Sequence, residues 1–454
     1  MSIVVLARLL SPSDYGLLAM VTAVIGVGEL LRDLGLSVAA VQSRTLSAGE
    51  KSNLFWVNTL IGAVLTALVF SLSWAISALY DQPELVTITQ VLALTFFLNG
   101  IAAQFKAQIN RDLRFMVLGV CEAAPQAMGL LIAILVALQG GGYWALVAQA
   151  MVVAGSALIL DVLCARWRPG LPDRRVSIRR FLRFGGALAG TQGLAYVAKN
   201  IDNVLLGVFY GSGVLGIYSR AYQLIVLPLN QMTAPLSRVA IPILSRLQDD
   251  REKFVRYLKS GQFFTVTLSA VFYGSMIGLA DPIVRVVLGD RWLAVIPVLQ
   301  ALSISGVFRA MGQVPYWIFV ALGLTGRQFK IYAVSQPIVI IAILLGVPWG
   351  GVGVALGCSI GYLLFWFVQM WWAGRVSGIS TLSLIGSGLG LVCLIGIPVV
   401  AIGFAVTSAF DSAMSSLGVG LLGVFAYTAI ITLAVPAYRR QLQTVFTILK
   451  RRRA

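Results

Sequence analysis

The sequence predicts an all-α polytopic membrane protein with two six-helix lobes in parallel repeat around a central cavity, plus two C-terminal helices. Two observations predict this class. Of the 454 residues, 59% are hydrophobic and only 11% are charged, which leaves too few polar side chains to cover one soluble core. Apolar segments of about 20 residues, the length with which a helix crosses the hydrocarbon, recur along the whole chain. An outer-membrane barrel would show short alternating strands instead.

Thirteen complete spans are predicted from these segments. They lie near 16–40, 54–80, 85–108, 116–138, 143–165, 184–209, 213–244, 261–288, 295–322, 331–347, 350–373, 382–407 and 414–435. The apolar start, 1–10, is half as long as a span, and we interpret it as the end of a first helix whose beginning is missing. A signal peptide does not fit, because the start lacks a basic region and a small-residue cleavage site. A short re-entrant start is the alternative.

Two pairs of similar turns indicate an internal repeat. The turn PSDYGL at 12–17 is related to SGVLGI at 212–217, and GGYWAL at 141–146 is related to GGVGVA at 350–355. Because six is even, two six-helix halves would enter the membrane from the same side, which makes the repeat parallel. The predicted parts are an N-terminal lobe (1–165), a basic cytoplasmic linker (166–183), a C-terminal lobe (184–374), two additional helices (375–438) and a basic cytoplasmic tail (439–454).

Positive charge is concentrated in alternate connections. Most of the 34 basic residues lie in these connections, whereas the connections between them hold only Arg8, Arg285 and Arg291. Because positive charge in short loops marks the cytoplasmic side, we expect both termini in the cytoplasm. Topology thus explains the net charge of +17 without nucleic acid as a partner, since no folded domain would present these residues. The linker 166–183 is additionally expected to contact anionic membrane lipids, or to be simply a cytoplasmic linker.

The sequence shows no pattern typical of an enzyme or of a metal site. Its four cysteines, Cys121, Cys164, Cys358 and Cys393, fall one to a span without paired spacing, and histidine is absent. There is no glycine-rich phosphate loop with lysine and no nucleophile elbow. We therefore expect a protein that moves its substrate without transforming it and that needs no cofactor and no metal.

Charged residues inside the predicted spans are the first candidates for function. An ionised group at bilayer depth costs roughly 2.5 to 3.5 kcal/mol, so it normally faces a partner, a bundle interior or a water-filled cavity. At helical spacing, opposite charges can pair within one patch of three residues and within one pair of residues. The alternative role of both clusters is structural, as ion pairs that hold helices together. The patch is Glu29, Arg32 and Asp33, and the pair is Lys199 and Asp202. The candidates for ion coupling are the four carboxylates Glu29, Asp33, Asp202 and Glu122.

Arginines without an acidic neighbour on their own helix are the second set of candidates. Arg220 and Arg238 lie on one stripe of the span near 213–244 with Gln231 between them, and Arg309 has Gln313 one turn below it. A guanidinium offers a bidentate fork and stays charged, which suits phosphate. Pairing with a carboxylate on another helix is the alternative, and Arg238 is nearer the cytoplasmic end. The predicted substrate-binding residues are Arg220, Arg309, Arg238, Gln231, Gln313, Lys199 and Arg32.

Three prolines recur at seven-residue spacing in the same span, at Pro228, Pro235 and Pro242. Proline removes a backbone hydrogen bond and kinks a helix. A bend that helps the two halves to rock and a static kink are both compatible with this pattern.

Short motifs in a fixed order resemble one transporter family. They are RLLSPSDYGL at 8–17, DLGL at 33–36, FW at 55–56, RDLRF at 111–115 and YWALV at 143–147. The whole chain resembles the bacterial polysaccharide transporters, the Wzx-type oligosaccharide flippases of the multidrug/oligosaccharidyl-lipid/polysaccharide exporter superfamily. The likeness is closest to the branch that includes the colanic acid exporter. The sequence departs from the family's usual length at its start.

The resemblance implies a multi-pass protein of the bacterial inner membrane that works by alternating access. It would flip an undecaprenyl-diphosphate-linked oligosaccharide from the cytoplasmic to the periplasmic leaflet, for exopolysaccharide, capsule or lipopolysaccharide assembly. Arg220 and Arg309 would hold the diphosphate while the polyprenyl tail stays in lipid, and a polysaccharide polymerase and co-polymerase are possible partners. The alternatives are a multidrug and toxin extrusion antiporter, against which the arginines argue, and a non-transporting scaffold of a polysaccharide synthesis complex.

Overall fold

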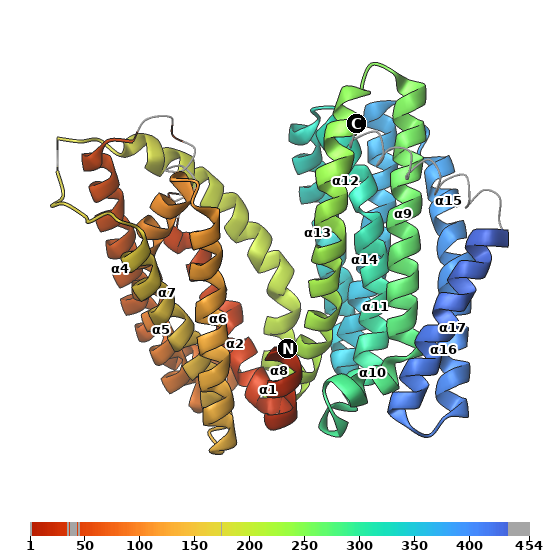
Figure 1. The fold of residues 1–454 in the computed structure, drawn as a ribbon, viewed down its shortest axis with the longest axis horizontal. Coiled ribbons are helices and arrows are strands. Elements are labelled where there is room, and N and C mark those ends of the chain that lie inside the picture. The colour runs from red at the N-terminus through yellow and green to blue at the C-terminus, as the bar shows by residue number, and fades with distance from the viewer. Residues whose placement is uncertain (1, 34–35, 37–42, 44–45, 174, 435–454) are drawn as a thin grey trace. The chain divides into compact units, whose positions relative to one another are not determined.

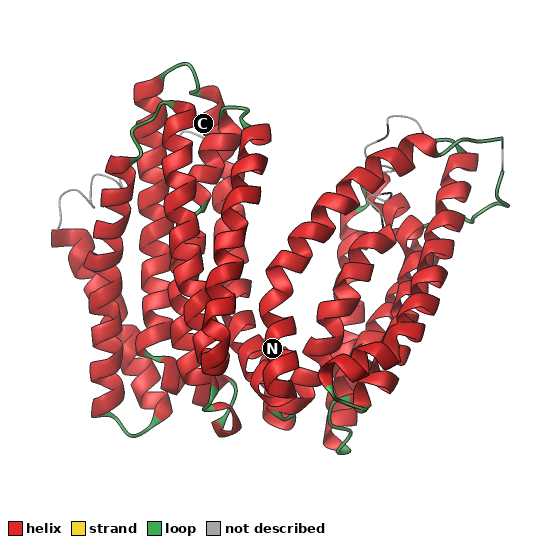
Figure 2. Cartoon of the chain, turned by 180° about the vertical axis from the view of Figure 1, so that it is seen from behind, coloured by secondary structure: helices red, strands yellow, loops and turns green. Residues whose placement is uncertain are grey.

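The structure is a computed structural model. It describes residues 2–33, 36, 43, 46–173 and 175–434, apart from the side chains at 2–3, 30–31, 33, 180, 182–195 and 197–199. Throughout that part every regular element is a helix, and short loops join most of the helices (Figure 1, Figure 2). The predicted all-α class is confirmed.

The chain divides into two compact units, and unit 1 comprises Met1–Gly216. Inside it α4 packs along α5 and α6 packs along α7, while α5 also contacts α7 and α2. A short turn joins α4 to α5 and another joins α6 to α7, so the two helices in each of these pairs are antiparallel neighbours. The helices are α1 (Ser2–Leu9), α2 (Pro12–Asp33), α4 (Ala48–Tyr80), α5 (Glu84–Arg111), α6 (Phe115–Leu138), α7 (Trp144–Cys164) and the first part of α8 (Arg179–Arg246).

Unit 2 comprises Ile217–Ala454. Within it α11 packs against α9 and α14, α14 packs along α13, and α16 packs against α9 and α17. After the rest of α8 its helices are α9 (Arg251–Gly278), α10 (Ala280–Val287), η1 (Asp290–Trp292), α11 (Val295–Met311), α12 (Gln313–Ala321), α13 (Thr325–Gly346), η2 (Val347–Trp349), α14 (Gly350–Ser377), α15 (Leu382–Leu391), the π-helical η3 (Val392–Gly396), α16 (Ile397–Ala409) and α17 (Ala413–Ala434).

Each predicted span overlaps one of these helices or a succession of them. Nine helices of the described part are long and apolar enough to cross a membrane, and the pair α9 and α10, bent by 80°, makes ten. Two of the nine are long enough for two crossings each: Asn200–Arg246 has 47 residues and Thr325–Ser377 has 53. The span predicted near 16–40 runs past α2 into residues outside the described ones.

Helix α8 contains two of the predicted spans, near 184–209 and 213–244, and Gly211 separates them. Its φ of 75° and ψ of −175° interrupt the helix, and this region of backbone space is accessible essentially to glycine alone. The three prolines, by contrast, lie inside the helical second part of α8. Whether that part bends during function stays a prediction.

The connection between α7 and α8 is bound to the start of α4. The Asn53 side-chain amide donates to the carbonyl oxygens of Asp173 (2.8 Å) and Val176 (2.9 Å) and accepts from the Asp173 N–H (2.8 Å). The indole of Trp56 donates to the Gly170 carbonyl at 2.9 Å. Helix α8 starts at Arg179, inside the range predicted as linker. The predicted lobe boundaries differ from the division after Gly216 and stay a prediction.

Glycines allow two helix pairs of unit 2 to approach backbone to backbone. A Cβ atom on Gly278 of α9 would lie 2.6 Å from the Val400 carbonyl oxygen and 2.9 Å from the Cα of Gly403 on α16. A Cβ on Gly346 of α13 would collide with the backbone of Gly353 on α14. Small residues are how membrane helices pack when lipid offers no hydrophobic driving force.

Candidate functional site

Arg309 of α11 lies between two tyrosines of unit 2. Its Nη2 donates to the hydroxyl oxygen of Tyr222 on α8 at 3.0 Å and to that of Tyr362 on α14 at 2.8 Å. Its guanidinium carbon lies 4.1 Å from the ring centroid of Tyr362 and 5.1 Å from that of Tyr222, within cation–π range. One half-buried cation therefore joins three helices.

Further aromatic rings hold the two tyrosines in place. Tyr218, one turn before Tyr222 on α8, stacks on it with centroids 6.2 Å apart. Tyr362 meets Phe365 edge to face at 6.1 Å, and Phe365 meets Tyr332 of α13 at 5.6 Å. Aromatic pairs at these distances contribute beyond their buried area, by about 0.5 to 1.5 kcal/mol each. The hydroxyl acceptors of Arg309 are thus positioned by packing.

The positive charge of Arg309 is not neutralised within the described residues. Its hydrogen-bond partners there are phenols, no carboxylate pairs with it, and its Nε and Nη1 bond to none of the described groups. A phenol accepts a hydrogen bond without supplying negative charge. The arrangement leaves one net positive charge and further N–H donors, which are the groups that an anion requires. Binding of an anion by Arg309 stays a prediction.

Gln313, predicted beside Arg309, is engaged elsewhere in unit 2. Its Oε1 accepts from the Ser237 hydroxyl at 3.2 Å, and that hydroxyl accepts from the Trp317 indole at 2.9 Å. These bonds join α12 to α8. A role of Gln313 toward substrate stays a prediction.

The second part of α8 carries a polar, exposed stripe. Gln231 and Arg238 are exposed, and so is Asn230, which was missed although it lies beside Gln231 in the sequence. Arg238 makes no ion pair with a described residue. Polar side chains on a span are costly against lipid, so this face is expected to meet water or a polar ligand. Arg220 is half-buried and has an interaction of its own, and its ligand role also stays a prediction.

In unit 1, Glu29 and Arg32 of α2 form the ion pair that their spacing predicts. Arg32 Nε lies 3.0 Å from Glu29 Oε2, and Arg32 Nη1 donates to the Asn99 carbonyl at 2.9 Å. The Asn99 amide donates to Glu29 Oε1 at 3.3 Å. The structural alternative fits this network, because it satisfies both charges and joins α2 to α5. The side chains of Asp33 and Lys199 lie outside the described ones.

The remaining carboxylates differ in burial. Asp202 is buried and has an interaction of its own, whereas Glu122 pairs with Lys106 at 2.7 Å on an exposed surface. Asp161 of α7 is buried with 3% of its surface exposed. Asp161 is not among the residues predicted from the sequence, although it lies in the predicted span 143–165, where a charged group is costly.

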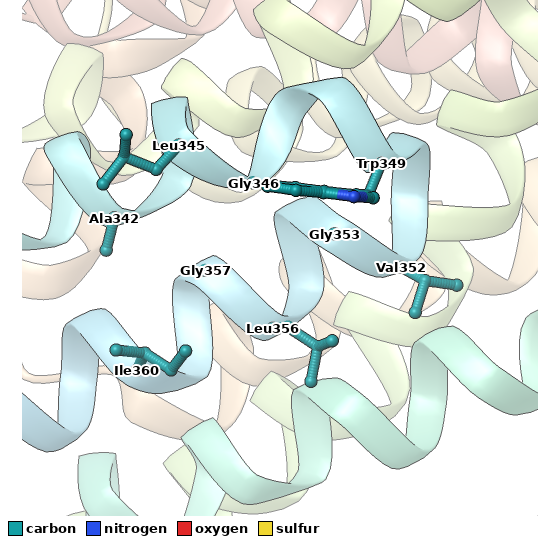
Figure 3. A pocket seen from close by; sticks show the side chains of 9 residues that line it. All are labelled: Ala342, Leu345, Gly346, Trp349, Val352, Gly353, Leu356, Gly357 and Ile360. Atoms are coloured by element: carbon teal, nitrogen blue, oxygen red, sulfur yellow. The ribbon is translucent and has the colours of Figure 1, made fainter.

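An apolar groove of about 540 Å³ lies on α13, η2 and α14. Figure 3 shows the side chains of Leu345, Trp349, Leu356 and Ile360 around it, with glycine backbone between them. Its lining offers almost no polar group, so it suits hydrocarbon and does not suit an anion.

Comparison with known proteins gives one family and one fold. The model of the polysaccharide biosynthesis protein family matches residues 5–297. The lipopolysaccharide biosynthesis protein WzxC of Escherichia coli (strain K12) is 29% identical over 367 residues, which cover 79% of this chain and 73% of that protein.

Among solved structures, the lipid II flippase MurJ in an inward closed conformation has a TM-score of 0.73 at 15% identity, over 96% of each chain. An inward-facing multidrug resistance transporter of the MATE family and MOP superfamily has a TM-score of 0.64 at 15% identity, over 83% of this chain and 93% of that one. At such low identity the two likenesses establish the fold, and the match over more than half of the sequence places the chain in the polysaccharide biosynthesis protein family.

Proposed function

We propose that this protein flips an undecaprenyl-diphosphate-linked oligosaccharide from the cytoplasmic to the periplasmic leaflet of a bacterial inner membrane. The product serves exopolysaccharide, capsule or lipopolysaccharide assembly, and transport proceeds by alternating access. Three facts support the proposal: the family match, the relative named for lipopolysaccharide biosynthesis, and the fold shared with a lipid II flippase.

Arg309 carries the proposal at the level of chemistry. A lipid-linked glycan enters the membrane with a diphosphate, and this group needs a cation that no carboxylate has already neutralised. Arg309, held by Tyr222 and Tyr362, meets this requirement. The exposed stripe with Gln231 and Arg238 offers further polar contacts on the same unit.

The test is leaflet translocation of a lipid-linked oligosaccharide by the purified protein in proteoliposomes. Arg309→Ala is expected to reduce the rate at least tenfold, since it removes the charge that binds the diphosphate. Arg375→Ala is the matched control, because Arg375 also stacks on an aromatic ring, that of Trp371 at 4.2 Å, but lies exposed at the end of α14. A wild-type rate in a folded Arg309→Ala protein would remove this residue from the site.

Ion coupling, orientation and partners extend the proposal. Glu29, Asp33, Asp202 and Glu122 are proposed to take part in coupling, with both termini in the cytoplasm. Arg220, Gln313, Lys199 and Arg32 are proposed as further substrate contacts. A polysaccharide polymerase and co-polymerase are proposed as partners, because the flipped glycan is their substrate.

A multidrug antiporter is the main alternative, since one such transporter shares the fold. Cationic drugs call for acidic groups, whereas the guanidinium of Arg309 would repel them. Translocation of a cationic dye without translocation of a lipid-linked glycan would favour the antiporter. A scaffold for the polysaccharide synthases would translocate neither substrate.

A further inference from the structure

Asp161 is a buried acid that the proposed transport site does not use. It lies in the last turn of α7 in unit 1, with 3% of its surface exposed, and its Oδ1 accepts no hydrogen bond from a described residue. The side-chain hydrogen bond of Asp161 comes from the Cys121 thiol, a weak donor, so the buried carboxylate is costly, whereas the neutral acid is not. The side chain therefore calls for a ligand that removes its charge.

Two helices bring charged and titratable groups to Asp161. These groups are Lys106 on α5 and Cys121 and Glu122 on α6. Cys164 lies one turn further along α7 itself. Lys106 is the cation among them, but its Nζ lies 2.7 Å from Glu122 Oε1. Lys106 therefore favours an Asp161 anion, whereas Glu122, which pairs with the same ammonium group, opposes one. The thiols of Cys121 and Cys164 supply no cation.

Position and packing point the same way. The backbone N–H of Ala165 donates to the carbonyl of Asp161 at 2.9 Å, which places the acid at the negative end of the helix. Arg114 also reaches this end, where its Nη1 donates to the carbonyl of Cys164 at 2.7 Å. On one side Cys121 belongs to an apolar cluster with Phe55, Phe105 and Ile109. The Lys106–Glu122 pair is about half exposed, with 49% and 55% of the two side chains accessible. Because charged groups are costly against lipid, this polar edge of the cluster is expected to face water.

We propose that Asp161 is a proton-binding site of unit 1. A proton binds to a carboxylate oxygen and makes the side chain a neutral acid. On release it passes to water at the Lys106–Glu122 edge, and no other bond changes. Coupling of this proton to flipping rests on the proposed function, whereas the binding itself does not.

Infrared difference spectroscopy tests the binding without any transport. The full chain is purified in lipid nanodiscs without substrate and compared between acidic and neutral pH. The wild type is expected to show the carbonyl stretching band of one protonated, buried carboxyl group, and Asp161→Asn is expected to lose it. Asp411→Asn, which removes an exposed carboxylate between α16 and α17, is expected to retain the band. An unchanged band in Asp161→Asn would overturn the proposal.

A second variant covers the case in which the amide protein does not fold. Asp161→Glu keeps a carboxyl group in the same place, so its band is expected to move to another frequency. If that band has the wild-type frequency and titration, it belongs to another residue and the proposal fails.

Transport separates coupling from binding. With the lipid-linked oligosaccharide in proteoliposomes, a proton gradient is expected to accelerate wild-type flipping and to leave Asp161→Asn unaffected. Equal acceleration of both proteins would overturn the coupling. If the wild type flips nothing, the proposed function fails while the infrared band still decides the proton site.

Discussion

Arg309 keeps its charge in a partly buried setting through two phenols. Moving a guanidinium out of water costs several kcal/mol, and each ring contact returns roughly 0.5 to 2 kcal/mol. The hydrogen bonds to Tyr222 and Tyr362 stabilise the guanidinium further, but they add no negative charge. A bound phosphate would supply it, so ligand and protein stabilise each other at this residue.

The hydroxyl of Tyr362 is expected to contribute to stability by itself. Tyr362→Phe keeps the ring but leaves Arg309 Nη2 with one acceptor fewer. The free energy of unfolding should fall by about 1.5 to 3 kcal/mol, the range for hydrogen bonds to charged groups. Denaturant unfolding of the purified protein measures this value.

Tyr316→Phe is the matched control, because Tyr316 is partly exposed on α12 and its hydroxyl bonds to none of the described residues. It should leave the free energy of unfolding unchanged. Equal stability of Tyr362→Phe and the wild type would show that the hydroxyl does not hold the guanidinium.

Residue by residue, the sequence predicts charges well and their partners poorly. It predicts that Arg309 lacks an acidic neighbour and that Glu29 pairs with Arg32, because both follow from spacing along one helix. It does not predict Tyr222, Tyr362 or Asn99. These partners lie 87, 53 and 67 residues from the arginines they bind, and only the fold brings them together.

Among the elements, α8 depends on a single residue for its interruption. Gly211 has a conformation that a side chain disfavours, so Gly211→Ala is expected to lower the free energy of unfolding by about 1 to 3 kcal/mol. Gly213→Ala is the control two residues on: this glycine is helical and its Cβ would meet nothing within 4 Å. Alanine there should be neutral or stabilising by up to about 1 kcal/mol.

Thermal unfolding of the two alanine variants in one detergent compares them directly. The midpoint should fall for Gly211→Ala and hold or rise for Gly213→Ala. A fall of equal size in both would mean that the interruption at Gly211 carries no backbone strain.

Hydrophobic runs predict the helices but not where they bend. The run 261–288 is continuous in sequence, yet it forms α9 and α10 with an 80° bend. Next to the bend, Gly278 meets the backbone of Gly403 on α16, and this contact joins residues far apart in sequence. Hydropathy likewise does not predict the π-helical turn η3 inside the span 382–407, because length and composition set the crossing and not its local winding.

For the whole molecule, the resemblance to polysaccharide transporters drawn from short motifs is confirmed by the family match. The distribution of Lys and Arg predicts that the loop between α16 and α17 lies outside and the loop between α14 and α15 lies in the cytoplasm.

Labelling of single introduced cysteines tests the orientation, in a variant from which the four native cysteines have been removed. In intact cells a membrane-impermeant maleimide should label Asp411→Cys, between α16 and α17, but not Ser380→Cys, between α14 and α15; both positions are exposed. Ser380→Cys should react only after the inner membrane is permeabilised. The reverse pattern would place both termini outside.

The Asn53 contacts have a consequence for how the basic connection can change. Asn53 and Trp56 hold the segment through its backbone carbonyl and N–H groups, which every amino acid except proline provides in full. These hydrogen bonds therefore do not depend on the arginine side chains of the segment, whereas its Trp167 packs on the rings of Phe55 and Phe105. Exchange of an arginine in this segment is therefore expected to alter its charge and to leave these backbone hydrogen bonds in place.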